Sequence, residues 1–279
     1  MRSLTEILAI LAVMSTPATA IGADDTESVD RSMAEVQEID ADQSALLPYM
    51  AAICGDEASM TSGDEGVHPV CPNCPQGSSA DSGSLSLDEG YVGDFSGDGQ
   101  SEAILATTGC GGGHNFRFST VVLRQLGEDW QMLEYNDGVG SSSCDPIETP
   151  HGARLLCQET VVGQGSALTS VTLRTVADES LTSTSLTRLS DDSGACRYDG
   201  EYRQTLEERI VDDLDGDGNV ELALRIQSSH GEPVRDDIGV GERCDEDNYE
   251  FSETETLNVW KIESGGVTRN DDLAKFIDD

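Results

Sequence analysis

Two short segments of this 279-residue chain carry oxygen-bearing side chains at every second position. They read YVGDFSGDGQSEAILAT at 91–107 and IVDDLDGDGNVELALRI at 210–226, and seven of these seventeen positions are identical at an offset of 119 residues. Carboxylate and amide oxygens spaced in this way around a tight turn are ligands that a hard divalent cation such as calcium prefers. The candidate ligands are Asp213, Asp215, Asp217, Asn219 and Glu221 in the second segment, and Asp94, Ser96, Asp98, Gln100 and Glu102 in the first.

The second segment carries more negative charge than the first. In a calcium loop, position 7 supplies a backbone carbonyl and position 9 often acts through water, which suits Asn219 and Glu221. Gly218 falls at the sharp turn, where a Cβ atom would clash. Three neighbouring aspartates would repel one another without a cation. The first segment has fewer carboxylates, so we expect weaker binding there.

An acidic turn without a metal is the alternative interpretation of either segment, because the chain carries 54 Asp and Glu residues. The recurrence of the same spacing at two places favours the calcium interpretation.

The two segments resemble the calcium loops of FG-GAP/VCBS-type repeats, which are β-rich modules of extracellular proteins. They also resemble the first nine positions of an EF-hand loop. The bidentate Glu that an EF-hand needs at position 12 is replaced by Leu105 and Leu224, which favours a loop that runs directly into a strand. Successive FG-GAP repeats lie closer together than the 119 residues between these two loops. The resemblance implies a calcium-stabilised adhesion or recognition surface and no particular reaction.

Runs of β-branched and apolar residues recur between turn residues from Gly90 onward, which is typical of an all-β domain. The expected strands cover residues 104–108, 119–126, 130–135, 153–162, 168–176, 182–189, 221–228 and 256–262. Good helix formers leave the state of residues 204–211 and 221–226 open. The expected fold is mainly β, with duplicated β-sheet repeats in a partial propeller-like arrangement or a sandwich.

The N-terminal part of the chain has a different character. Residues 1–20 combine Arg2, a short apolar run and a small-residue cleavage site, which predicts a signal peptide cleaved after Ala20. Residues 21–88 are expected to form a disordered acidic arm, a short helix capped by Ser44 and a linker that contains cysteines. The first β repeat is expected at 89–190 and the second at 191–279, with a short helix at 271–276.

Eight cysteines in an exported chain predict up to four disulfides, and sequence proximity favours Cys144–Cys157 and Cys196–Cys244. The CxxC pair Cys71 and Cys74 lies outside any strand–helix pattern and has no second pair for zinc. Structural disulfides are therefore expected there. The expected location is the periplasm or the extracellular space.

The formal net charge of −38 repels phosphate groups. We therefore expect no nucleic-acid partner and no attraction to anionic membranes. No segment is long and apolar enough for a membrane span.

The sequence offers no recognisable catalytic pattern. The four histidines lack zinc-type spacing, no GxSxG motif is present, and Trp130 and Trp260 are expected in the core. The main expectation is an exported, disulfide-stabilised, calcium-binding β-repeat protein with a noncatalytic role in binding or envelope structure. Its candidate partners are calcium and an unidentified extracellular protein or glycan. The alternatives are a secreted hydrolase with an unrecognised site and an EF-hand-like calcium buffer or sensor.

Overall fold

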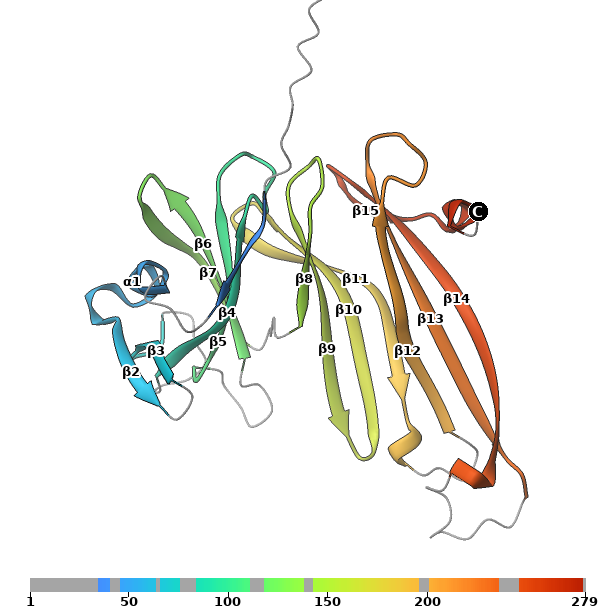
Figure 1. Cartoon of the computed structure of the whole chain (residues 1–279). Helices are drawn as coiled ribbons and strands as arrows, with labels where there is room; N and C mark the ends of the chain where they lie inside the picture. Colours follow the sequence, from blue (N-terminus) through green and yellow to red (C-terminus); the bar gives the residue numbers. More distant parts are fainter. Residues whose placement is uncertain are drawn as a thin grey trace, which may run out of the picture. The chain divides into compact units, whose positions relative to one another are not determined.

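The computed structural model describes residues 35–40, 46–63, 66–75, 84–110, 118–137, 143–195, 201–235 and 246–277. These residues belong to one unit, Arg31–Asp279, and form two antiparallel β-sheets (Figure 1). The expectation of a mainly β fold is therefore confirmed. The predicted signal peptide and most of the predicted acidic arm lie outside the described residues.

The first sheet has seven strands in the order β2-β3-β4-β5-β6-β7, with β1 also paired to β4. β3 and β1 pair with successive parts of the same edge of β4. The strands are β1 (Gln37–Asp40), β2 (Ser59–Gly63), β3 (Gly66–Cys71), β4 (Leu85–Gly93), β5 (Glu102–Thr108), β6 (Phe118–Leu126) and β7 (Asp129–Asp137).

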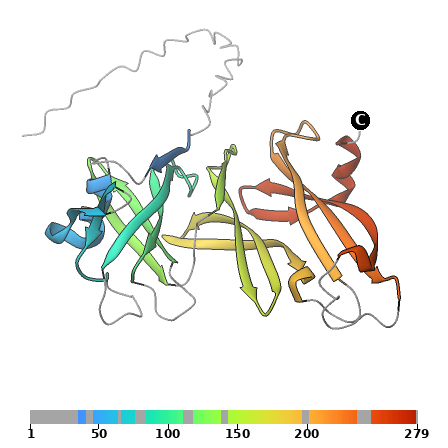
Figure 2. The same cartoon turned by 60° about the horizontal axis from the view of Figure 1, so that its bottom comes forward.

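The second sheet has eight strands, each paired with its neighbours in sequence, so the chain crosses it as a series of hairpins (Figure 2). One registered pair, Asp191 with Arg203, joins β11 to β12, so the sheet consists of two four-stranded groups, β8–β11 and β12–β15. The strands are β8 (Cys144–Ile147), β9 (Arg154–Gly163), β10 (Ser166–Ala177), β11 (Ser180–Asp191), β12 (Glu201–Asp212), β13 (Val220–Pro233), β14 (Tyr249–Glu263) and β15 (Gly266–Arg269).

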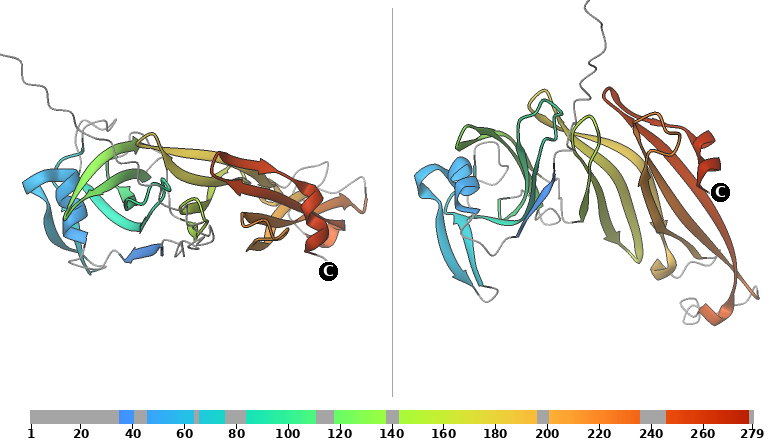
Figure 3. Two further views of the ribbon diagram at one scale, coloured as in Figure 1. Left: turned by 90° about the horizontal axis from the view of Figure 1, so that it is seen from above. Right: turned by 45° about the horizontal axis from the view of Figure 1, so that its top comes forward.

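All eight strands expected from the sequence fall on observed strands. Residues 204–211 lie in β12, and the whole of 221–228 lies in β13. Both are extended because pairing across the sheet outweighs their helix propensity. The expected C-terminal helix is the 3₁₀-helix η6 (Asp271–Phe276), which lies against β14 (Figure 3). The other 3₁₀ turns among the described residues are η2 (Gly55–Glu57), η3 (Ser193–Ala195) and η5 (Glu246–Asn248).

The expected short helix is α1 (Leu47–Cys54), with Pro48 in its first turn, where the missing N–H costs nothing. Leu46 takes the N-cap position without a side-chain hydrogen bond. Ser44, the expected cap, lies outside the described residues. Met50 is buried in the core of the first sheet, and the Tyr49 ring lies 4.9 Å from that of Trp130 on β7.

The linker expected within residues 55–88 is wrong in part, since β2 and β3 form a hairpin there, and β1 lies within the expected arm. β1 and β2 are short and mostly polar, and β3 is short and contains His68 and Pro69, so none shows the clear alternation of apolar residues that reveals a strand in sequence. β1 and β3 pair with β4, β2 pairs with β3, and the disulfides of Cys71 and Cys74 lie nearby.

Three disulfides join described cysteines: Cys54–Cys71, Cys74–Cys110 and Cys144–Cys157. The third confirms one pairing expected from proximity, whereas Cys196 and Cys244 lie outside the described residues. The two members of the CxxC pair bond to different partners, so both have a structural role. Disulfides form in oxidising compartments, which indicates a periplasmic or extracellular setting.

The central strands are buried on both faces. Leu105 of β5 packs in the core that α1 covers, whereas Ile104 packs in a second core with residues of the other sheet. That second core joins the two sheets; its buried members are Tyr91, Phe95, Ile104, Val122, Cys144, Ala153, Leu155, Cys157 and Val176. A third core, within the second sheet, holds Trp260 at 4% exposed, so the expectation of core packing for this residue is confirmed.

The segment pairs β4–β5 and β12–β13 have the same register. Tyr91 faces Ile104 and Ile210 faces Ala223, which are equivalent at the offset of 119 residues. Both pairs also contain a register shift at the same relative place, between Leu87 and Glu89 and between Leu206 and Glu208. The similarity of the two segments therefore extends beyond the residues that are identical.

Candidate metal centre

Loop 2 (residues 213–219) joins β12 to β13, and the carboxylate of Asp213 organises its backbone. Asp213 Oδ1 accepts hydrogen bonds from the backbone N–H groups of Gly216 (2.8 Å) and Asp217 (3.0 Å), and Oδ2 accepts one from Gly218 (2.9 Å). Gly216 and Gly218 have φ angles of 75° and 86°, which a residue with a side chain rarely adopts. The two glycines therefore permit the turn that the sequence predicts.

The side chains of loop 2 gather around Lys261 of β14. Lys261 Nζ lies 3.1 Å from Asp215 Oδ2 and also contacts Asp217. The hydrogen bond from Lys261 lowers the pKa of Asp217 to about 2, and the same bond raises the pKa of the lysine. Lys261 reaches the loop because β14 places it directly opposite Glu221 of β13.

Glu221 is the buried member of this group, with an exposed fraction of 0%. Its Oε2 atom accepts a hydrogen bond from Leu214 N (2.8 Å), whereas its Oε1 atom is buried without a hydrogen-bond partner. Lys261 Nζ lies 3.7 Å from that oxygen, too far for a hydrogen bond. Burial is the main cause that raises the pKa of Glu221. A buried carboxylate oxygen without a hydrogen-bond partner is costly, so this site favours a cation.

Asp213, Asp215 and Glu221 each direct a carboxylate oxygen into one cluster, in which these oxygens all lie within 4.8 Å of one another. Among the described residues no other group of three or more His, Cys, Asp or Glu side chains meets this condition. The donors are all oxygens, as hard divalent cations require. Asp217 and Asn219, the other two expected ligands, bond to each other through Asp217 Oδ1 and Asn219 Nδ2 (3.0 Å).

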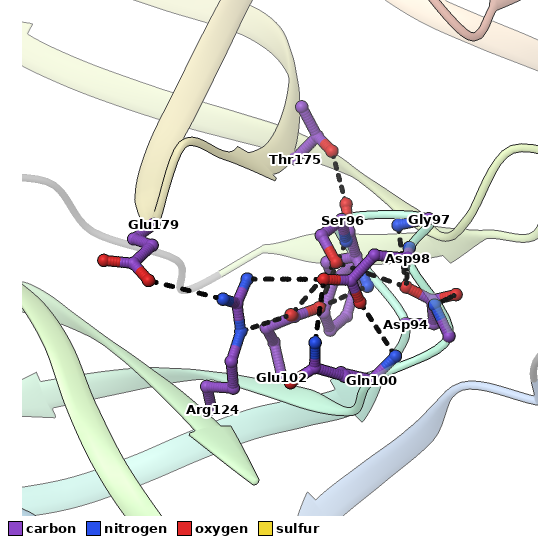
Figure 4. Close-up of polar contacts among 11 residues, drawn as sticks. Asp94, Ser96, Gly97, Asp98, Gln100, Glu102, Arg124, Thr175 and Glu179 are labelled. Atoms are coloured by element: carbon purple, nitrogen blue, oxygen red, sulfur yellow. Dashed lines mark hydrogen bonds and ion pairs between the residues drawn. The ribbon is translucent and has the colours of Figure 1, made fainter. Parts of the chain in front are cut away.

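Loop 1 (residues 94–101) joins β4 to β5 and repeats the same backbone arrangement (Figure 4). Asp94 Oδ1 accepts from the N–H groups of Gly97 (2.7 Å) and Asp98 (3.1 Å), and Oδ2 accepts from Gly99 (3.0 Å). Gln100 Nε2 donates to Asp98 Oδ2 (3.2 Å), as Asn219 does to Asp217 in loop 2. The two loops thus share one hydrogen-bonding scheme.

The buried glutamate of loop 1 has more partners than that of loop 2. Glu102 Oε2 accepts from Phe95 N (2.9 Å) and Ser96 N (3.1 Å), and Oε1 accepts from Ser96 Oγ (3.1 Å) and from Arg124. Burial still raises the pKa of Glu102, although these hydrogen bonds act in the opposite direction. Both oxygens of this fully buried carboxylate are therefore satisfied by the protein itself.

Arg124 of β6 lies directly opposite Glu102, in the register position that Lys261 holds opposite Glu221. Its Nε atom donates to Glu102 Oε1 (3.1 Å), and its other nitrogens lie 3.9 Å from Asp98 and 3.6 Å from Glu179. Glu179 comes from the turn between β10 and β11, so Arg124 joins the loop to the second sheet (Figure 4).

Loop 1 is also anchored to the second sheet through its backbone. Asp94 O accepts a hydrogen bond from Ala153 N (2.6 Å), and Phe95 O accepts one from Thr175 Oγ1 (2.6 Å). The Phe95 side chain is completely buried in the core that joins the two sheets. A Cβ atom on Gly97 would lie 2.3 Å from His151 O. Loop 1 therefore fits closely against the β8–β9 connection, which leaves it little freedom.

His151 of that connection also reaches loop 2. Its Nε2 atom lies 3.0 Å from Asn219 Oδ1, within hydrogen-bonding distance. The connection between β8 and β9 thus contacts loop 1 with its backbone and loop 2 with a side chain.

The sequence places all ten expected ligands in two strand–loop–strand units, and the structure brings three of them, Asp213, Asp215 and Glu221, into one cluster. Sequence reasoning missed Lys261, Arg124 and His151. A signal for the first two was present, since each lies on the second strand after its loop, at a similar distance before a turn. It becomes visible only when the register of that strand is known.

In comparisons with known proteins, no family model matches the chain, and neither does any curated protein or solved structure. None of the described helices has the length and apolar character needed to cross a membrane.

Proposed function

We propose that this chain is an exported calcium-binding protein whose metal centre is loop 2 together with Glu221. The observation that carries the proposal is the buried Glu221 Oε1 atom, which has no hydrogen-bond partner and belongs to a carboxylate that forms one cluster with those of Asp213 and Asp215. A dication at this place would supply the missing partner and offset the repulsion among the carboxylates.

Calcium fits the donor set better than a transition metal does. Zinc and copper sites use histidine or cysteine, and this cluster contains carboxylates only. Calcium accepts six to eight oxygens in flexible geometries, which suits a loop with Asp217 and the backbone carbonyl of Asn219 as further donors. Magnesium is smaller and retains its water, so it fits such an all-protein cage less well.

A structural role is sufficient to account for such a site. Free calcium at about 100 times its dissociation constant stabilises the folded state by about 2.7 kcal/mol. Net stabilities of domains are only about 5–15 kcal/mol, so one site has a substantial effect. We therefore propose a noncatalytic role in binding or envelope structure, with an extracellular protein or a glycan as the partner.

The repeat arrangement supports the FG-GAP/VCBS resemblance as part of this proposal. β4–β7, β8–β11 and β12–β15 are three successive four-stranded antiparallel units. In each, the first two strands are joined by a segment at the same place: loop 1, residues 148–153 and loop 2. The spacing of 119 residues between the acidic loops then corresponds to two units, and in the middle unit, β8–β11, residues 148–153 do not have the acidic pattern of the loops.

Export is part of the same proposal. The predicted signal peptide at 1–20 would deliver the chain to a compartment in which its disulfides form and free calcium is plentiful. The EF-hand-like alternative receives no support, since both loops connect strands rather than helices.

Calorimetric titration of the mature protein with calcium tests the proposal. We expect binding by the wild type and a loss of at least 100-fold in affinity for Glu221→Gln and Asp215→Asn. The matched control is Asp212→Asn, which removes the same charge one residue before the loop. Wild-type protein that binds no calcium, or the same affinity in all three variants, would contradict the proposed centre.

A further inference from the structure

We propose that the positive charge of Arg124 prevents calcium from binding in loop 1. In loop 2, Lys261 occupies the corresponding place only until calcium displaces it. The inference rests on the proposed function, which it deepens: the chain binds one calcium ion, although it has two loops of matching sequence.

The register of the sheets puts the two basic residues in equivalent places. Glu102 pairs with Arg124 between β5 and β6, and Glu221 pairs with Lys261 between β13 and β14. Each cation therefore lies on the second strand after its loop, β6 or β14, opposite the buried glutamate of the first. The two differ in the cationic group and in the contacts that hold it.

Arg124 is held from three sides. Its guanidinium group faces Glu102, Asp98 and, from the second sheet, Glu179. A guanidinium is planar, stays charged and offers several donors in a fixed geometry, so it can serve several carboxylates together. A metal ion in loop 1 would have to displace all of these contacts at once.

The acids of loop 1 are also already satisfied. Each side-chain oxygen of Asp94, Asp98 and Glu102 accepts at least one hydrogen bond from the protein. Ser96 replaces the aspartate that loop 2 has at Asp215, and its hydroxyl donates to Glu102. Loop 1 therefore has one carboxylate fewer and no buried oxygen without a partner.

Among the described residues, Lys261 forms ion pairs only within its own loop unit, with Asp215, Asp217 and Glu221, and it leaves one oxygen of Glu221 without a hydrogen bond. An ammonium on a flexible stem has no fixed geometry and is strongly hydrated, so it can swing into water. A dication attracts the same carboxylates about twice as strongly at equal distance. Lys261 therefore leaves loop 2 when calcium arrives.

The first test counts the calcium ions bound per chain by titration calorimetry. We expect one for the wild type and two for Arg124→Met, which keeps the apolar stem and removes the charge. Arg124→Lys keeps the positive charge and removes the planar guanidinium group. We expect this variant to bind a second ion more weakly than Arg124→Met does. Adding Asp98→Asn to Arg124→Met should abolish the second site, which locates it in loop 1. The expected circular dichroism spectrum of each variant is that of the wild type.

The reciprocal test uses loop 2 and does not depend on the folding of the Arg124 variants. We expect Lys261→Met to bind calcium at least tenfold more tightly, because a competing positive charge is gone. We expect Lys261→Arg to bind at least tenfold more weakly, since it gives loop 2 the cation of loop 1. Unchanged affinity in both Lys261 variants would overturn the inference.

The outcomes also separate this inference from the proposed function. Wild-type protein that binds two ions, or folded Arg124→Met that still binds one, would overturn the inference while the calcium centre in loop 2 stands. Wild-type protein that binds none would overturn both.

Discussion

Loop 1 and loop 2 fold their backbones with the same hydrogen bonds, although they lie in different sheets and have different neighbours. Loop 1 is packed against the β8–β9 connection, and its Phe95 side chain is completely buried. The equivalent residue in loop 2, Leu214, is only half-buried. The same local turn is therefore packed against a neighbouring segment in one place, whereas in the other Asp213, Asp215 and Asp217 are exposed.

This difference teaches that an acidic turn motif specifies a backbone shape and not a ligand. In each loop an aspartate at the first position accepts hydrogen bonds from three backbone N–H groups and so folds the turn. Whether carboxylate oxygens remain available depends on the residue that the next strand places opposite the glutamate.

The largest expected effect comes from the matched pair Gly97→Ala and Gly216→Ala. Both glycines have nearly the same φ angle, 76° and 75°, so the strain of an alanine is the same, about 1–2 kcal/mol. Only Gly97 would also clash with His151 O, at 2.3 Å, whereas a Cβ on Gly216 meets nothing within 4 Å. We expect Gly97→Ala to cost about 4 kcal/mol in total and Gly216→Ala about 1 kcal/mol, measured by urea unfolding. Equal losses would show that loop 1 is not tightly docked.

The second comparison is between Glu102→Gln and Glu221→Gln, which remove the charge of the two buried glutamates. It is made in a chelating buffer, so that no calcium is bound. We expect Glu102→Gln to lower the free energy of unfolding by about 2 kcal/mol, because it leaves Arg124 without its main partner. We expect Glu221→Gln to leave stability unchanged or raise it by up to about 1 kcal/mol, because it removes a buried charge of which one oxygen has no hydrogen-bond partner. Urea unfolding at neutral pH measures both. If Glu221→Gln lowered the free energy of unfolding as much as Glu102→Gln does, the two carboxylates would not differ in how well the protein satisfies their hydrogen bonds.

The contact between the two sheets at Tyr91 can be tested through the pH dependence of stability. Its hydroxyl donates to Cys144 O (2.5 Å), and burial raises its pKa from 10.0 to about 12, with nearby acids contributing. The folded-state pKa is the higher one, so the stabilisation is fully present below pH 10 and is lost as the pH rises toward 12. This loss amounts to about 2–3 kcal/mol.

We expect Tyr91→Phe to lower the free energy of unfolding by about 1 kcal/mol at neutral pH. Between pH 10 and 12 we expect the variant to lose less stability than the wild type does. Urea unfolding across this range, together with the ultraviolet titration of the tyrosines, measures it. A variant that loses stability as steeply as the wild type would show that other groups cause the alkaline loss.

The smallest effect is expected at His151, which links the β8–β9 connection to Asn219. His151→Ala removes one partly exposed hydrogen bond, so we expect a loss of at most about 1 kcal/mol. Because Asn219 belongs to the proposed centre, we also expect calcium affinity to fall by no more than about fivefold. Thermal unfolding and calcium titration measure these effects, and a much larger loss of affinity would mean that the two loops are strongly coupled.

The sequence predicted the strands well where apolar and β-branched residues dominate, as in β5 and β13. It failed for the short strands β1, β2 and β3, which gain order from pairing with β4 or, for β2, with β3, and from the disulfides. It predicted the disulfide between Cys144 and Cys157, which pair across neighbouring strands β8 and β9. It could not predict Cys54–Cys71 or Cys74–Cys110, because these pairings depend on how α1 and β3 pack.

The sequence by itself determined the two acidic turns, because glycine positions and an aspartate that binds the local backbone act over only a few residues. It also determined the mainly β character, which follows from the side-chain pattern along each strand. Only the tertiary structure decided which loop keeps an unsatisfied carboxylate oxygen. Arg124 and Lys261 lie more than twenty residues from the glutamates they face, and only strand register brings these charges together.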